Sequence, residues 1–176
     1  GSFRTIGVVT QHIERTGEAL TTEGVLAAAW RAGYTVSMIQ VERPASEDMR
    51  TAVLHLAHQG VDGLVVVQAG RADSRHLVLP ADVPVAVSDS ALVGYYPSAS
   101  ADQVRGARAA VDHLLGLGHR EVHHVTGPQD SQSALIRSAT WAARLRESGI
   151  EPPEPVQGDW TAASGYAAGE RLAADP

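Results

Sequence analysis

The sequence GLVVVQ at residues 63–68 is apolar almost throughout, and the predicted fold is built around it. A short aliphatic run of this kind is expected of a strand that helices cover on both faces of a parallel sheet. Strand and helix patterns alternate around it, with strands predicted at 4–10, 35–41 and 84–88, and helices at 18–32, between 46 and 60, and near 72–77. This βαβαβαβ series predicts a parallel sheet with right-handed crossovers.

Helix-ending signals support this pattern. Gly33 follows the first helix and suits the left-handed conformation just beyond a helix C-terminus. Ser46 is placed to cap the second helix, whose first turn carries Glu47 and Asp48, charges that the positive end of a helix dipole favours. Gly60 is expected to end that helix.

The alternation of strand and helix patterns stops at residues 90–101 and resumes after them. Helices are predicted at 102–117, 134–148 and 162–174, and strands at 121–126 and 155–157. We interpret 90–101 as a crossover between an N-terminal lobe, residues 3–101, and a C-terminal lobe, residues 102–176; a single larger sheet is the alternative. The second lobe has too few strands to cover its helices, so we expect it to be truncated.

The composition limits the classes of partner. The net charge of −6 argues against a nucleic-acid surface, because phosphate binding needs a local excess of cations. The sequence has no Cys, no apolar run approaching roughly 18 residues, and no leader pattern. We therefore expect a cytoplasmic protein that has no disulfides and does not contact a membrane.

Motifs for catalysis and metal binding are missing. The sequence contains no nucleophile elbow, phosphate loop or GxGxxG pattern, so we expect no enzyme activity and no cofactor. Eight His residues raise the question of a metal site. His123 and His124 are adjacent in a predicted strand and point to opposite faces, so they cannot chelate one ion together. We expect no metal.

Several motifs resemble, in the same order, those of the lactose-repressor family of bacterial transcription regulators. They are Ile6–Val9, Gly33-Tyr34, Val61–Leu64, Pro84–Asp89, HLLGLGHR at 113–120, Thr126-Gly127-Pro128, Ser133–Arg137, Gly158-Asp159-Trp160 and Ser164-Gly165-Tyr166. The resemblance covers residues 4–174. The sequence departs from the family pattern at Thr140, where Gly is usual, and at Val67, where the lactose branch has an amide.

The resemblance implies a fold and a function. The expected fold is α/β, like that of type I periplasmic binding proteins, with two flavodoxin-like parallel-sheet lobes around a sugar or another small effector. A helix-turn-helix headpiece precedes this core in the family and reads the operator. The headpiece and the family's C-terminal portion are absent here, so we expect operator DNA to be bound only through the missing headpiece.

Candidate effector contacts in the second lobe are Ser133, Arg137 and Trp160, which match the family pattern. A guanidinium can clamp a pair of hydroxyls or a carboxylate, and an indole can stack on the apolar face of a sugar ring. Each residue has a structural alternative. Ser133 could cap the helix, Arg137 could be a solvated helix residue, and Trp160 could plug the core, as Trp141 on the same helix as Arg137 is expected to do.

Candidate contacts in the first lobe follow the strands, because ligands of open parallel sheets bind beyond the carboxyl ends of the strands. Asp89 matches the family's first-lobe contact and could accept two sugar hydroxyls, although an Asx-turn or a helix cap is the alternative. Gln11 and Gln68 are expected at the rim of the same site.

The first helix, 18–32, has two apolar faces. Val25, Ala28, Ala29 and Ala32 are predicted to face the sheet, while Leu26 and Trp30 point elsewhere. A second apolar face on a surface helix is typical of an interface. The first helix lies at the dimer interface in the resembling family, so we predict a homodimer through Leu26 and Trp30.

Together these features favour the ligand-sensing core of a transcription repressor. The alternative is an exported sugar-binding protein of a transporter, which has the same fold. An enzyme of flavodoxin-like architecture is a more distant rival, because the catalytic motifs it needs are absent.

Overall fold

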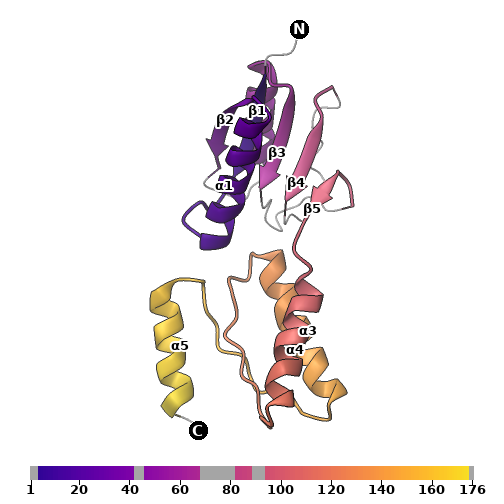
Figure 1. The fold of residues 1–176 in the computed structure, drawn as a ribbon. Coiled ribbons are helices and arrows are strands. Elements are labelled where there is room, and N and C mark those ends of the chain that lie inside the picture. The colour runs from indigo at the N-terminus through magenta and orange to yellow at the C-terminus, as the bar shows by residue number, and fades with distance from the viewer. Residues whose placement is uncertain (1–3, 42–45, 68–81, 89–93, 175–176) are drawn as a thin grey trace. The chain divides into compact units, whose positions relative to one another are not determined.

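The computed structural model describes residues 4–41, 46–67, 82–88 and 94–174. The chain divides into two compact units, residues 1–100 and residues 101–176 (Figure 1). The short helix expected near 72–77, and residues 90–93 of the expected crossover, lie outside the described residues. Within the described ranges, no helix is both long enough and apolar enough to cross a bilayer.

Unit 1 contains one parallel sheet in the order β2-β1-β3-β4-β5. The predicted strands are confirmed as β1 (Thr5–Thr10), β2 (Thr35–Gln40), β3 (Gly63–Val67) and β4 (Val85–Ser88). A fifth strand, β5 (Ser98–Ala99), was not predicted. Its two exposed small residues pair with Val87 and Ser88 and carry no apolar signal that a sequence could show.

Helices cover both faces of this sheet, as the apolar run of β3 indicated. Val9 and Leu64 pack with Val53 and Leu56 of α2 (Ser46–His58) in a buried aliphatic core. α1 (Thr16–Arg31) crosses the sheet in Figure 1. Neighbouring strand residues point to opposite faces, so Val8 points away from the core that Val9 forms with α2. Val8 is fully buried as well.

The predicted stripe of α1 was partly wrong. Ala29 is buried and Val25 half-buried, but Ala28 and Ala32 are exposed. The buried positions nearer the helix start are Glu18 and Thr22, one turn apart. Two polar residues therefore set the rotation of α1 at its first turns, which hydrophobicity alone could not predict. The predicted end is confirmed, because Gly33 follows the helix with a φ of +75°.

Unit 2 contains α3 (Gln103–Gly116), α4 (Gln132–Glu147) and α5 (Ala162–Ala174). Its core is formed by Val111, Val122, Trp141 and Leu145. The predicted burial of Trp141 is confirmed, and its indole N–H donates a hydrogen bond of 2.9 Å to the carbonyl of Val122.

The two strands predicted in unit 2, at 121–126 and 155–157, are reduced to one parallel bridge between Val125 and Val156. Thr126 N–H donates to Val156 O over 2.8 Å, and Val156 N–H donates to His124 O over 2.9 Å. Each extended segment pairs with only one neighbour among the described residues, and the pairing is too short to count as a ladder. The two segments nevertheless lead into the loops that carry Gly127 and Trp160.

Candidate functional site

In unit 2, the side chains of Arg137 and Trp160 lie next to each other. Arg137 extends from the exposed side of α4, and its Cζ lies 5.8 Å from the centroid of the indole ring. Its Nε donates a hydrogen bond of 2.6 Å to Oε1 of Gln103, at the start of α3. Trp160 is 40% exposed and is therefore not a core plug. Two of the predicted contacts are thus adjacent and open to solvent.

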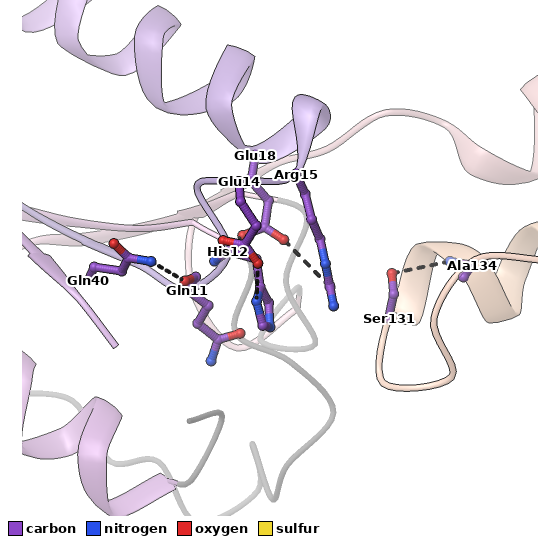
Figure 2. A network of polar contacts seen from close by, with 8 residues as sticks. All are labelled: Gln11, His12, Glu14, Arg15, Glu18, Gln40, Ser131 and Ala134. Atoms are coloured by element: carbon purple, nitrogen blue, oxygen red, sulfur yellow. Dashed lines mark hydrogen bonds and ion pairs between the residues drawn. The ribbon is translucent and has the colours of Figure 1, made fainter. Parts of the chain in front are cut away.

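Ser133 is placed differently from the prediction that it could cap the helix. The residue that caps α4 is Ser131, whose Oγ accepts a hydrogen bond of 3.3 Å from the N–H of Ala134 (Figure 2). Ser133 lies inside the first turn of α4 and is buried. The sequence Ser131-Gln-Ser133 offers two hydroxyls two residues apart, and the pattern did not reveal which of them begins the helix.

Asp159 organises the loop around Trp160. Its Oδ1 accepts hydrogen bonds from the backbone N–H of Thr161 at 2.8 Å and from the Thr161 hydroxyl at 2.7 Å. Hydrogen bonds that involve Ser164 and Thr161 hold the pKa of the Asp159 carboxyl down, at about 2. Asp159 is therefore a carboxylate throughout the neutral range. Sequence reasoning missed this role of Asp159. The usable signal was Thr161, which precedes α5 at the N-cap position and marks the loop that Asp159 holds.

His124 packs against α4. Its Nε2 is 2.9 Å from the hydroxyl of Ser138, and its ring is tilted against Trp141 with the centroids 5.1 Å apart. Burial, and to a lesser extent the positive charge of Arg137, lower the pKa of His124 below its ordinary value of 6.5. The imidazole is therefore neutral near pH 7. The adjacent His123 has a different partner, since its Nε2 lies 3.4 Å from Oε1 of Glu121.

In unit 1, the side chains of Gln40 and Glu18 form hydrogen bonds with the backbone of the loop after β1. Gln11 is buried, and its backbone oxygen accepts a hydrogen bond of 3.1 Å from Nε2 of Gln40. His12 N–H donates to Glu18 Oε2 over 2.7 Å, and Arg15 lies 3.8 Å from the other oxygen of Glu18 (Figure 2). Sequence reasoning missed Glu18, because a carboxylate on the sheet-facing side of a helix contradicts the apolar pattern.

The other two predicted contacts of unit 1, Asp89 and Gln68, lie outside the described residues. An open cavity of about 330 Å³ lies elsewhere in this unit, between β2 and α2. Gln40, Asp48, Thr51 and His55 supply its polar lining, and Gln11 is not among the described residues that line it. The described residues contain no group of three or more potential metal ligands.

Comparisons with known proteins agree with the residue pattern, although no family model matches the chain. The lactose operon repressor of Escherichia coli (strain K12) is 30% identical over 172 residues, which are 92% of this chain and 45% of that protein. The repressor PurR of Klebsiella pneumoniae subsp. pneumoniae is 27% identical over 175 residues, 96% of this chain and 51% of that protein.

Solved structures give the same answer. A dimeric lac repressor with an 11-residue C-terminal deletion superimposes with a TM-score of 0.83, at 27% identity, over 97% of this chain and 64% of that one. A lac repressor dimer bound to operator and the anti-inducer ONPF gives 0.84, at 27% identity, over 99% of this chain and 62% of that one. The chain belongs to the lactose-repressor family.

Membership of the lactose-repressor family fixes the fold as that of an α/β core of the periplasmic-binding-protein kind. The curated relatives are repressors rather than enzymes. The chain spans about half the length of these relatives, 45% and 51%.

Proposed function

We propose that this chain is the effector-binding core of a transcription repressor and that its effector is a sugar. The observation that supports this most directly is the pair formed by Arg137 and Trp160, 5.8 Å apart and open to solvent. A guanidinium presents several N–H donors in a fixed plane, which suits a pair of adjacent hydroxyls. An exposed indole provides a flat apolar surface, which suits the C–H face of a pyranose.

The proposed binding mode has to accommodate a hydrogen bond that Arg137 already makes. The Nε of Arg137 already donates to Gln103, over 2.6 Å, so a ligand would use the remaining N–H groups or replace Gln103. Both side chains are polar and lie near the surface, so the exchange costs little. Gln103 thereby serves as a stand-in acceptor that keeps the guanidinium in place when no ligand is bound.

We also propose Asp89, Gln11 and Gln68 of unit 1 as effector contacts, with the carboxylate of Asp89 accepting sugar hydroxyls. An effector that binds one arrangement of the two units more tightly than the other shifts the population toward that arrangement. In a homodimer this shift would change operator binding through a helix-turn-helix headpiece preceding this core. Such a regulator works in the cytoplasm.

The experiment is a thermal-shift screen of the purified protein with monosaccharides, disaccharides and ONPF. A sugar that binds the folded state raises the melting temperature in proportion to the logarithm of its concentration. Arg137→Ala and Trp160→Ala should each abolish the shift. The matched control is Arg146→Ala, which removes an exposed arginine from the last turn of the same helix.

The result has two clear readings. A sugar-induced shift that survives in Arg137→Ala and in Trp160→Ala contradicts the proposed site. Absence of a shift with every sugar contradicts the proposed ligand class. The sequence encoded upstream of residue 3 tests the regulator itself, since a helix-turn-helix is expected there and a secretory leader would favour a transporter's binding protein.

A further inference from the structure

Trp160 has a backbone conformation that its residue type disfavours. Its φ is +68°, in the left-handed region where a Cβ crowds the following carbonyl. A bulky residue in this region is strained, and such strain persists only where neighbouring contacts impose it. Two sets of contacts hold Trp160 in this conformation.

The first of these contacts comes from Asp159. Its carboxylate accepts two hydrogen bonds from Thr161, and its backbone N–H donates to the Ser164 hydroxyl over 3.2 Å. Thr161 in turn accepts a hydrogen bond of 3.1 Å from the N–H of Ser164, in the first turn of α5. The residues before and after Trp160 are thus tied to each other and to a helix, so the backbone between them cannot relax freely.

The second contact is with Gly127, at the end of the 121–126 segment. A Cβ added at Gly127 would lie 2.3 Å from both Cε2 and Nε1 of the Trp160 indole. The backbone of Gly127 is anchored as well, since its carbonyl accepts a hydrogen bond of 3.0 Å from Gln157. The φ of Gly127 is not among the positive values, so glycine is needed here for space rather than for backbone freedom.

We propose that Gly127 and Asp159 are positioning residues that preset the indole of Trp160 beside Arg137 as a rigid platform for the ligand. The role of the platform rests on the proposed function, whereas the positioning itself does not. A side chain that is already held in its binding orientation loses less conformational freedom when a ligand arrives, and affinity rises accordingly. Strain at Trp160 is then the cost of this preorganisation.

The variants that test this are Gly127→Ala and Asp159→Ala. Gly127→Ala adds one methyl group against the indole. Its matched control is Gly165→Ala in α5, where an added Cβ meets nothing within 4 Å. Asp159→Ala removes both acceptors for Thr161. Asp159→Asn is its rescue variant, because the amide keeps one oxygen that can accept the same bonds.

The primary measurement needs no ligand. The chain has three Trp residues, so a ¹H–¹⁵N spectrum contains three indole N–H signals. Trp160→Phe identifies the signal of Trp160, and the signals of Trp30 and Trp141 serve as internal references. We expect Gly127→Ala and Asp159→Ala to shift or broaden the Trp160 signal alone, while Gly165→Ala and Asp159→Asn leave it close to its original position. A Trp160 signal that stays unchanged in both alanine variants overturns the proposal.

The second measurement is affinity for ONPF and for any sugar found in the screen. Each alanine variant should weaken binding by about tenfold or more, which corresponds to about 1.4 kcal/mol. If the Trp160 signal moves but affinity does not, the positioning holds and the indole is not a ligand contact. That outcome rejects the platform role and this part of the proposed function. A parallel loss of affinity and indole order supports both.

Discussion

The carboxylate of Glu18 accepts a hydrogen bond of 2.7 Å from the backbone N–H of His12, across the loop that joins β1 to α1. Glu18 is only 1% exposed. Its second oxygen has no hydrogen-bond partner among the described residues, nor have the hydroxyls of Thr10 and Thr22. The contact with Arg15 is long, at 3.8 Å. A buried carboxylate thus holds the loop while its own charge is poorly compensated.

Glu18→Gln should therefore stabilise the protein at neutral pH. Burial raises the pKa of Glu18 above its ordinary value of 4.5, so the folded chain binds the proton more tightly than the unfolded chain does. The stability that this group contributes is fully present below 4.5 and is lost as the pH rises through the folded-state pKa. Gln keeps an acceptor for His12 without a charge to bury. Melting temperatures measured between pH 4 and pH 8 should show the gain of the variant growing as the pH rises.

The control for this series is Glu23→Gln, at an exposed position of the same helix. It should follow the wild-type curve. If Glu18→Gln instead lowers the melting temperature most at pH 8, the carboxylate is better compensated than its contacts indicate.

Leu145→Ala should destabilise unit 2 strongly. Leu145 is fully buried on α4, in the core that it shares with Val111, Val122 and Trp141. Truncation to Ala removes apolar contacts and leaves a cavity, at a cost of about 2–5 kcal/mol. Chemical denaturation monitored by fluorescence measures the loss. Leu117→Ala, an exposed position after α3, should change the free energy of unfolding by less than about 0.5 kcal/mol.

The sheet of unit 1 was predictable because its signals are local. The run at 63–67 is buried and aliphatic, and Gly33 and Gly60 end their helices with positive φ, as their residue type favours. β5 was not predictable, because Ser98 and Ala99 are exposed and owe their strand geometry to pairing with β4. The strand predicted at 121–126 was wrong, since among the described residues this segment pairs with one neighbour, through a single bridge between Val125 and Val156.

The site shows the same division. Arg137 and Trp160 could be named from motifs, and the structure brings them together. Gln103 could not, because it meets Arg137 from a position 34 residues away with no spacing that marks it. Gly127 was visible as part of a motif, but its contact with the indole depends on how two loops approach each other. Short-range rules do not contain that information.

His124 should make stability depend on pH in the opposite sense to Glu18. Its pKa is lowered, so the folded chain binds the proton less tightly than the unfolded chain. Its contribution is fully present above 6.5 and is lost as the pH falls through the folded-state pKa. His124→Phe, which keeps a ring against Trp141, should flatten the fall in melting temperature below pH 6.5. His119→Phe, at an exposed position, should leave that fall intact. A steep fall that persists in His124→Phe assigns the effect to another group.

Leu26→Asp should convert the protein into a monomer. Leu26 is 39% exposed and Trp30 is 80% exposed, and the two lie one turn apart on α1. Large apolar side chains that are exposed next to each other are typical of an interface. We predict that a second copy covers it, and a carboxylate placed in such an interface is costly because it loses water without gaining a partner. Sedimentation equilibrium should give twice the chain mass for the wild type and a single chain mass for Leu26→Asp. Leu117→Asp puts the same charge on an exposed site after α3 and should remain dimeric. A Leu26→Asp protein of undiminished mass places the interface elsewhere, and a monomeric wild type removes it altogether.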